Sequence, residues 1–342
     1  MYRVGIIGAG WVAGEHIRAY LKNPDTTVAA IAVRRPETAE AHMKTFGFSC
    51  EVFTDVAKML RATGLDIVSV CTPPSLHPEH AIAAAEAGCH LVLEKPVALS
   101  LKSLRRIQEV AKAARVKTVI SFVLRWNPLF ETIKALLAQD AIGRIFYGEV
   151  DYHHGIGPWY AQYRWNRLKA EGGSSLLSAG IHAVDALRWF AGKEALEVCA
   201  YSTNSNNTDV YPGGYEYDPT IVTIIKFADG VIGKVASNIE CIQPYTFPIT
   251  LQGTGGTIRN NQLYSKKLMP GQTSFATIPT ILPDSGDVTH HPFQGEIDHF
   301  VKCIQTNVES HCNLSDAIKT HEICYAAQMS ADEGRPVRLP LP

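Results

Sequence analysis

The stretch YRVGIIGAGWVA, residues 2–13, joins a short apolar run to a glycine-rich turn. Residues 2–7 are apolar enough to form a strand buried on both faces, and the pattern G-x-G-x-x-A follows directly. Gly8 permits a tight turn, Gly10 lets the backbone approach a pyrophosphate, and Ala13 lets the next helix pack close to the strand. A strand before it and a helix after it make this a predicted dinucleotide-binding turn, with a purely steric turn as the alternative.

Outward from this turn, short β-branched runs alternate with alanine-rich segments of helical period. Strands buried on both faces that alternate with helices are typical of a parallel, doubly wound α/β sheet. The sequence therefore predicts a Rossmann domain over residues 1–123. The expected strands are 2–7, 28–33, 67–71, 91–93 and 118–122, and the expected helices are 10–21, 36–46, 56–61, 77–87 and 100–114.

After about residue 128 the pattern changes, and residues 124–342 are predicted to form a second, α+β domain with antiparallel strand pairing. Residues 221–227 and 231–239 are joined by Ala228-Asp229-Gly230, which is the signature of a hairpin. Residues 202–217 and 270–291 are polar and rich in Pro or Gly, which predicts loops. The expected helices are 129–138, 180–191, 295–306 and 315–333, and the expected strands are 145–153, 197–202, 219–227, 231–239 and 247–252.

The composition favours a globular protein with a small-molecule partner. A chain of 342 residues is long enough for two domains, and 32 basic against 33 acidic residues leave no field to hold nucleic acid or an anionic membrane. The eight cysteines are far apart, without a Cys-x-x-Cys pair or zinc-like spacing, so reduced thiols and no metal site are expected. No signal peptide or membrane span is recognised, which predicts a cytoplasmic protein.

The end of the second predicted strand bears on the choice of cofactor. A carboxylate that binds the ribose of NAD is normally found there, but the sequence reads Val33-Arg34-Arg35-Pro36. Guanidinium groups suit a 2′-phosphate, so NADP is favoured over NAD. The alternative is that Arg34 stacks on the adenine of either cofactor.

Two motifs follow buried strands at the edge where open α/β sheets bind ligands. Residues 71–77 read CTPPSLH, and residues 94–96 read EKP. Lys95 is either a functional cation or an ordinary solvated strand end. Further along, Ser178 and His182 are four residues apart and share a helical face, and Asp185 is also within reach of His182. A structural histidine is the alternative for His182.

Together these residues resemble the glucose-fructose oxidoreductase and inositol dehydrogenase family (Gfo/Idh/MocA) over essentially the whole chain. The resemblance implies a Rossmann domain that binds NAD(P) and a second domain with an open, mostly antiparallel sheet that forms dimers or tetramers. It also implies substrates that are sugars, polyols or their keto forms. The motifs, in order, are the Gly8 turn, Thr72-Pro73-Pro74 with His77, Glu94-Lys95-Pro96, residues 172–173 through 180–182, and the tail 291–293 with Glu296, Phe300 and 330–340.

By this resemblance Lys95 is the catalytic lysine and His182 the acid/base. His182 would take the hydroxyl proton of a secondary alcohol as hydride leaves carbon, while Lys95 would stabilise the developing alkoxide. The expected cofactor contacts are Gly8, Gly10, Trp11, Val12, Arg34, Arg35, Thr72, Pro73, His77, Glu94 and Lys95. Donors and aromatic faces suited to a sugar ring, which are as often plain core, are Arg125, Trp126, Asn127, Tyr152, His153, Trp159, Tyr163, Trp165 and Ser178.

One departure from the family pattern bears on mechanism. The family often has Asp-x-Gly-x-His, and here Ser178 takes the place of the acid. A serine cannot hold an imidazolium electrostatically, so a full catalytic triad is not implied. The prediction is an NAD(P)-dependent dehydrogenase or reductase, with two alternatives: a glycoside hydrolase or lyase that uses a tightly bound cofactor transiently, and a non-catalytic sugar sensor.

Overall fold

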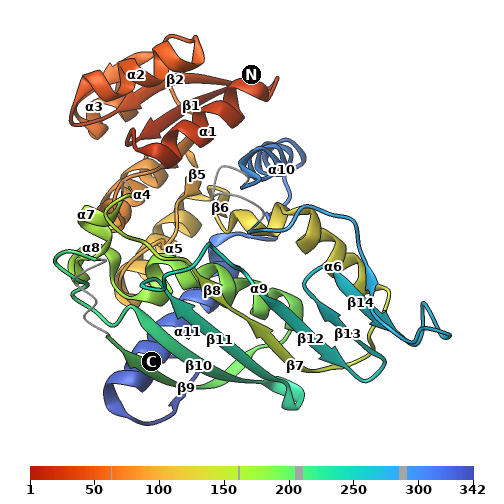
Figure 1. Ribbon diagram of the computed structural model, residues 1–342. Coiled ribbons are helices and arrows are strands. Elements are labelled where there is room, and N and C mark those ends of the chain that lie inside the picture. Colours follow the sequence, from red (N-terminus) through yellow and green to blue (C-terminus); the bar gives the residue numbers. More distant parts are fainter. Residues whose placement is uncertain (63, 161, 205–210, 285–290) are drawn as a thin grey trace. The chain divides into compact units, whose positions relative to one another are not determined.

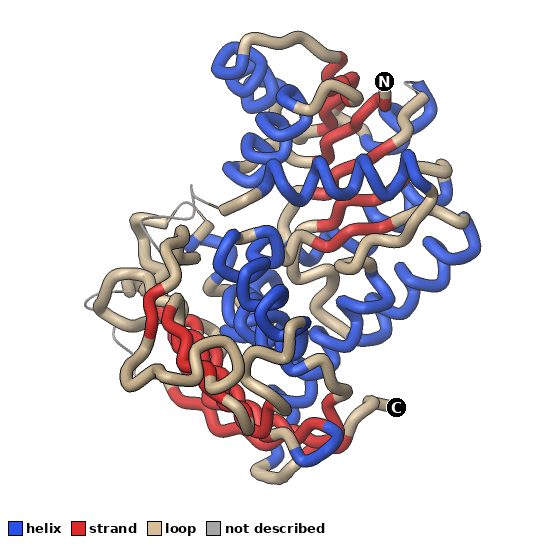
Figure 2. The backbone as a smooth tube through the Cα atoms, turned by 90° about the vertical axis from the view of Figure 1, so that its right-hand side faces the viewer, coloured by secondary structure: helices blue, strands red, loops and turns tan. Residues whose placement is uncertain are grey.

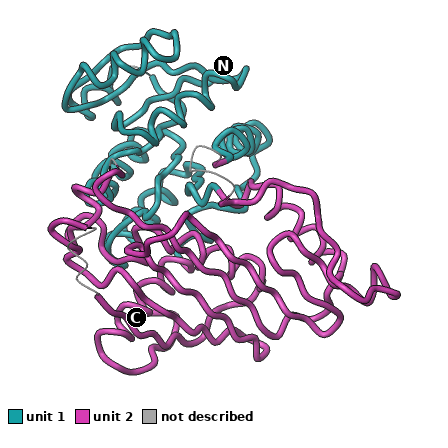
Figure 3. Tube along the Cα trace, viewed as in Figure 1, with its two compact units in different colours: residues 1–123, 292–318 teal, residues 124–291, 319–342 magenta. Residues whose placement is uncertain are grey.

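The computed structural model describes residues 1–342 except 63, 161, 205–210 and 285–290, and it divides into two compact units. Unit 1 contains residues 1–123 and 292–318, and unit 2 contains residues 124–291 and 319–342 (Figure 3). The division after Val123 coincides with the predicted boundary. Residues 292–318 differ from the prediction, because they belong to unit 1 and not to one continuous second domain.

The sheet of unit 1 has the strand order β3-β2-β1-β4-β5-β6, and every neighbouring pair is parallel (Figure 1). This order is that of the Rossmann fold, which confirms the predicted class. Figure 2 shows helices on both sides of these strands. The strands are β1 (Tyr2–Ile7), β2 (Thr26–Ala32), β3 (Glu51–Phe53), β4 (Ile67–Val70), β5 (His90–Leu93) and β6 (Thr118–Ile120).

The helices of unit 1 follow local start and stop signals. Ser100 precedes α5 and accepts the backbone N–H of Ser103, while α2 starts on Pro36 and ends at Gly47, whose φ is 69°. The helices are α1 (Trp11–Lys22), α2 (Pro36–Phe46), α3 (Val56–Ala62), the short 3₁₀ turn Pro74–Leu76, α4 (His77–Glu86), α5 (Leu101–Ala114) and α10 (Phe293–Thr306).

Helix α10 joins unit 1 through its contacts with α1. Phe293 lies against the rings of Trp11 and His16, at centroid distances of 6.2 and 5.4 Å. The amide of Asn23 donates to Asp298 at 2.6 Å. These partners are about 275 residues away in the chain, so no local pattern in the sequence could have indicated them.

Unit 2 contains a sheet with the order β15-β14-β13-β12-β7-β11-β10-β9-β16, and β8 pairs with β11. All pairs are antiparallel except those of β11 with β7 and β8, so the sheet is mixed. The predicted hairpin is present, with Asp229 at φ 58° between its strands. The strands are β7 (Ile145–Val150), β8 (Tyr152–His153), β9 (Ala195–Thr203), β10 (Thr220–Phe227), β11 (Ile232–Asn238), β12 (Ile249–Gly253), β13 (Gly256–Arg259), β14 (Gln262–Ser265), β15 (Ala276–Thr277) and β16 (Val337–Arg338).

One face of this sheet packs against helices, and the other carries exposed apolar side chains. Along β10, Ile221, Thr223 and Ile225 are buried, whereas Val222 and Ile224 are 41% and 44% exposed. This alternation is that of a strand with only one covered face. The helices of unit 2 are α6 (Pro128–Ala138), α7 (Tyr163–Asn166), α8 (Lys169–Gly172), a π-turn (Leu176–Gly180), α9 (Ile181–Ala191) and most of α11 (Leu314–Glu333).

Two kinds of feature are absent among the described residues. No described helix is long and apolar enough to cross a membrane. Within the same residues, no group of three His, Cys, Asp or Glu side chains has a geometry that could hold a metal ion.

Candidate active site

The turn between β1 and α1 has the geometry that a dinucleotide needs. Gly8 has φ 101°, and a Cβ on it would lie 2.6 Å from the carbonyl oxygen of Cys71, so only glycine fits. A Cβ on Gly10 would meet no described atom within 4 Å. Helix α1 starts at Trp11 without a side-chain cap, which leaves its first N–H groups available to an anion.

The end of β2 adjoins this turn, because the N–H of Gly8 donates to the carbonyl of Ala32 at 2.9 Å. The next residue, Val33, is buried, whereas Arg34 and Arg35 are exposed ahead of α2. Trp11 is also exposed in part, and Val12 is half-buried. Both guanidinium groups are therefore accessible at the strand end where a ribose is bound in this fold.

The two predicted motif loops of unit 1 are joined by His77. Its Nε2 lies 2.7 Å from the carbonyl oxygen of Thr72, and its Nδ1 lies 2.8 Å from that of Pro96. Burial lowers the pKa of His77, and a neutral imidazole donates to only one of these carbonyls at a time. His77 therefore holds the two loops together through its ring, while Thr72 and Pro73 are half-buried beside it.

Lys95 follows β5 at the carboxyl edge of the sheet. It is half-buried, and its backbone N–H donates to Oε2 of Glu94 at 3.3 Å. Burial lowers the pKa of the Lys95 ammonium, and the charge of Glu94 opposes this shift. A cation whose pKa is lowered in this way is suited to both electrophilic and proton-transfer chemistry.

His182 occupies the first turn of α9, directly after the π-turn that contains Ser178. π-Helical turns are rare in proteins, and those that occur are often found at functional sites. The ring of His182 lies edge-on to that of His291, with centroids 6.3 Å apart. The hydroxyl of Tyr217 donates to the carbonyl of Asn166 at 2.7 Å and lies 3.4 Å from Oγ of Ser178, and burial raises the pKa of Tyr217.

The sequence left open that the carboxylate of Asp185 contacts His182, but in the structure this carboxylate pairs with Arg125. Both of its carboxylate oxygens accept from Arg125, at 2.7 Å from Nε and 2.6 Å from Nη2, and Thr320 donates to Oδ1 at 3.0 Å. Arg125 is only 1% exposed. That Arg125 binds substrate stays a prediction, and in the structure its guanidinium is used in a buried, two-point ion pair.

Its neighbours Trp126 and Asn127 are also interior residues. The side chain of Asn127 caps α6 by accepting the N–H of Leu129 at 2.9 Å. Trp126 is 8% exposed. Residues 125–127 were predicted to bind substrate, and in the structure all three are buried and Asn127 caps a helix.

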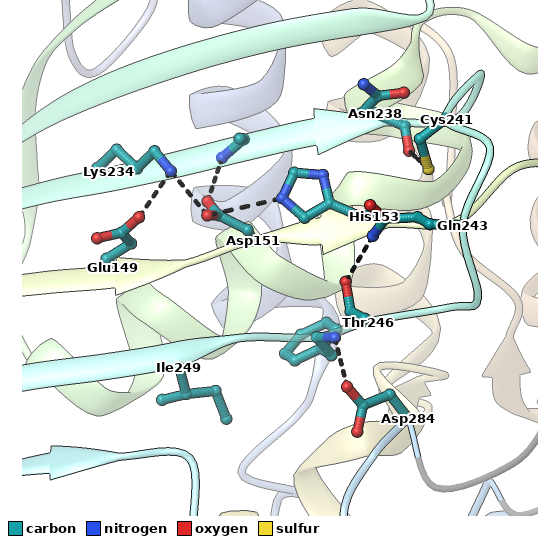
Figure 4. Close-up of polar contacts among 12 residues, drawn as sticks. Glu149, Asp151, His153, Lys234, Asn238, Cys241, Gln243, Thr246, Ile249 and Asp284 are labelled. Carbon is teal, nitrogen blue, oxygen red and sulfur yellow. Dashed lines mark hydrogen bonds and ion pairs between the residues drawn. The ribbon is translucent and has the colours of Figure 1, made fainter.

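His153 is directed at a charged cluster on the strands of unit 2 (Figure 4). Its Nε2 lies 3.8 Å from Oδ2 of Asp151, which accepts from Lys234 at 2.7 Å, and Lys234 also donates to Glu149 at 2.7 Å. Asp151 interrupts the predicted strand 145–153, because its Oδ1 accepts the N–H of Ala236 between β7 and β8. Burial alone would raise the pKa of Asp151, but these contacts lower it.

The aromatic residues predicted to contact substrate lie in two groups. Tyr152 is buried, with its hydroxyl 3.2 Å from Nδ1 of His154, while Trp165 is half-buried on α7. Trp159 is 65% exposed and lies 5.8 Å from the ring of Tyr211, and Tyr163 donates to a carbonyl of the segment that contains Tyr211.

The sequence predictions missed several residues in each of the two units. The tyrosines at 211, 215 and 217 fall in a stretch treated only as a polar loop, although the run YPGGYEY was a visible signal. In unit 1, His16 was passed over as an ordinary helix residue, yet it contacts Glu94 at 3.0 Å. Glu296, quoted only as part of a tail motif, is completely buried.

Comparison with known proteins identifies the family. The model of an oxidoreductase family with an NAD-binding Rossmann fold matches residues 2–122, and the model of the GFO/IDH/MocA C-terminal domain matches residues 130–259. This chain belongs to the GFO/IDH/MocA family of oxidoreductases. The predicted resemblance is thereby confirmed, and so is a Rossmann fold that binds NAD.

Two GFO/IDH/MocA relatives and one solved structure illustrate the likeness. D-glucoside 3-dehydrogenase of Escherichia coli is 30% identical over 68% of this chain and 66% of its own length. Levoglucosan dehydrogenase of Pseudarthrobacter phenanthrenivorans is 28% identical over 75% of this chain and 72% of its own length. A structure of levoglucosan dehydrogenase in complex with NADH and levoglucosan has a TM-score of 0.87 at 24% identity, covering 99% of this chain and 100% of that one, and shows the fold.

Proposed function

We propose that the protein is an NAD(P)-dependent dehydrogenase or reductase that moves a hydride between nicotinamide and a secondary alcohol or ketone of a sugar or polyol. The family and the names of its relatives support this activity. The observation that carries the proposal is Lys95, a half-buried cation with a lowered pKa at the edge of the sheet where this fold binds its cofactor.

Lys95 and His182 divide the chemistry between them. In the oxidation, His182 accepts the hydroxyl proton of the substrate, and Lys95 stabilises the negative charge that develops on the oxygen. In the reduction, the same groups donate the proton and polarise the carbonyl. The bound cofactor supplies the acceptor or donor of the hydride.

The aromatic groups of unit 2 fit a substrate with a sugar ring. Trp159 is 65% exposed, and its ring lies 5.8 Å from that of the buried Tyr211, so it offers an apolar face at the segment of residues 211–217. Sugar rings combine apolar C–H faces with a rim of hydroxyls, and aromatic side chains with interleaved donors bind such faces. Ser178 and His153 are the polar members of this proposed substrate site.

The finer proposal on the cofactor is a preference for NADP over NAD. It is supported by the exposed pair Arg34 and Arg35 and by the buried, apolar Val33 where an acid would bind the ribose. The solved relative named above carries NADH, so the preference is a property proposed for this chain and not one taken from that relative.

Two further proposals concern the protein as a whole. All eight cysteines lie among the described residues and are free thiols, which supports a reducing, cytoplasmic location. A homo-oligomer is supported by the exposed apolar face of the second sheet, where Tyr201, Val222, Ile224 and Ile232 are each more than a third exposed.

The activity is tested with a panel of sugars, polyols and keto-sugars, each assayed by the absorbance of NADH and of NADPH in both directions. With an active substrate in hand, Lys95→Met is expected to lower kcat at least a hundredfold, because it removes the group that stabilises the oxyanion. Dinucleotide affinity should stay within a few-fold. Lys102→Met, at an exposed position on α5, is the matched control.

Either of two results would contradict this assignment. Near-normal turnover by Lys95→Met would remove the lysine from the mechanism. Turnover of a glycoside without added oxidant, on a cofactor that stays bound through gel filtration, would point instead to a hydrolase or lyase.

A further inference from the structure

Three ionisable side chains from separate elements of unit 1 form a buried cluster beside Lys95. His16 comes from α1, Glu94 follows β5, and Glu296 comes from α10. His16 and Glu296 are 0% exposed and Glu94 is 8% exposed. Buried charges are costly unless they are paired, so a cluster of this kind requires an explanation.

A chain of hydrogen bonds leads through His16 to the backbone of Lys95. The hydroxyl of Tyr20 lies 2.8 Å from Oγ of Ser69, which lies 3.3 Å from Nδ1 of His16. Nε2 of His16 lies 3.0 Å from Oε1 of Glu94, and Oε2 of Glu94 accepts the N–H of Lys95 at 3.3 Å. The carboxylate of Glu94 therefore links the imidazole directly to the catalytic lysine.

In this series of hydrogen bonds, the positive charge of His16 is paired with the negative charge of Glu94. Burial alone would lower the pKa of His16, but its contacts with Cys71 and Glu94 raise it well above the usual value. Burial alone would raise the pKa of Glu94, but His16 lowers it. Burial raises the pKa of the Cys71 thiol, although His16 lowers it in part, and the carboxylate that lies against His16 is that of Glu94, 3.0 Å from Nε2.

Glu296 is the member of the cluster without a match. Neither of its carboxylate oxygens has a hydrogen-bond partner among the described residues. Burial raises the pKa of Glu296 to about 7 and Glu94 raises it further, although His16 and the hydroxyl of Ser121 lower it in part. The groups that face it are His16 and Tyr20 from α1, Cys71 after β4, Glu94 after β5 and Ser121 after β6.

We propose that Glu296 is a positioning residue for Lys95, which acts from α10 through His16 and Glu94. As a neutral acid, Glu296 leaves the positive charge of His16 to Glu94, and Glu94 then holds the backbone of Lys95. An ionised Glu296 competes with Glu94 for His16 and loosens that arrangement. The inference rests on the proposed function, in which Lys95 is the catalytic lysine.

The test compares Glu296→Gln with the wild type across pH. Glutamine has the shape of the neutral acid but cannot ionise, so at pH 6 the two proteins should have kcat/KM values within about threefold. As Glu296 ionises in the wild type, the ratio of variant to wild type should rise, by up to about tenfold at pH 8, since the pKa is about 7. Dividing the kcat/KM of the variant by that of the wild type cancels the titration of every group that is unchanged between the two proteins. Glu109→Gln, at an exposed position on α5, is the control and should give a flat ratio.

A second measurement does not depend on activity. A carboxyl whose pKa is raised on folding contributes most to stability below its unfolded value of about 4.3, and this contribution is lost as pH rises towards about 7. The difference between the melting temperature of Glu296→Gln and that of the wild type should therefore increase, in favour of the variant, from pH 5 to pH 7.5. In a background of His16→Asn, which lacks the imidazolium, Glu296→Gln should no longer change the pH dependence of kcat/KM.

The outcomes separate this inference from the assigned activity. A flat kcat/KM ratio overturns the positioning role, whether or not the melting temperatures diverge. A ratio that still rises with pH in the His16→Asn background also overturns it, because the effect would then not pass through His16. If Lys95→Met retains turnover, the proposed function itself fails, and the melting temperatures still report how Glu296 titrates.

Discussion

Single side chains at the end of β2 are expected to decide between the two nicotinamide cofactors. Replacing Arg34 and Arg35 together by Ala should weaken NADPH binding about 10- to 100-fold and barely affect NADH, since losing the charge-assisted hydrogen bonds of the pair costs about 1.5 to 3 kcal/mol in total. Isothermal titration with both cofactors measures the difference. Arg61→Ala, at an exposed position on α3, is the control. Equal losses for the two cofactors would rule out a phosphate clamp.

Ser178 offers a second test at the scale of one residue. A carboxylate at this position would favour the protonated form of His182, so Ser178→Asp should move the acidic limb of the kcat/KM profile upward by about one pH unit. Asp185 cannot take over this role, because Arg125 holds both of its oxygens. Ser178→Ala adds no charge and should leave the limb in place. If the acidic limb of the kcat/KM profile is still present in His182→Ala, a group other than His182 is the titrating base.

The residue scale also shows where sequence reasoning reaches its limit. The positions of Gly8, Lys95 and His182 follow from local motifs, because each depends on the turn or strand end next to it. The role of Arg125 depends on Asp185, 60 residues later, and a polar side chain after a strand looks the same whether it faces substrate or a buried partner. His16 and Glu296 are likewise explained only by contacts that the fold creates.

At the scale of secondary-structure elements, the Arg125–Asp185 pair ties three segments together. It joins the turn before α6 to α9, and Thr320 adds α11. Asp185→Asn would leave the buried guanidinium without its countercharge, which typically costs about 3 to 5 kcal/mol in the free energy of unfolding. Urea unfolding measures this change. The matched control is Asp229→Asn, which breaks the exposed pair with Lys193 and should change the midpoint little. A similar small change in both variants would contradict a structural role for the buried pair.

Elements were predicted well where their pattern is local and strong. Five strands of the Rossmann sheet and all five intervening helices were found within a few residues, because strands buried on both faces form continuous apolar runs. The strands β3, β13, β14, β15 and β16 were missed, since each is only two to four residues long and none is buried along its whole length, so none forms such a run. Asp151 ended β7 earlier than predicted because its side chain, and not its backbone, pairs with β11.

At the scale of the whole molecule, the exposed face of the second sheet predicts self-association. Ile224→Lys places a charge in the middle of that face and should shift the protein towards a smaller species in light scattering coupled to gel filtration. Ile281→Lys changes an isoleucine that is 56% exposed in a loop and should leave the assembly unchanged. A protein that is already monomeric, or equal masses for the wild type and Ile224→Lys, would argue against this surface as the interface.

Unit 1 is made of residues 1–123 and 292–318. Its second segment is therefore synthesised only after residues 124–291, which belong to unit 2. At about 5 to 20 residues per second, its last segment leaves the ribosome roughly 10 to 30 s after the first, once residues 124–291 have been made. During that interval the surface of α1 that later contacts Phe293 and Glu296 is uncovered. A fragment that stops at Val123 therefore lacks α10, and the rings of Trp11 and His16 lack their contact with Phe293.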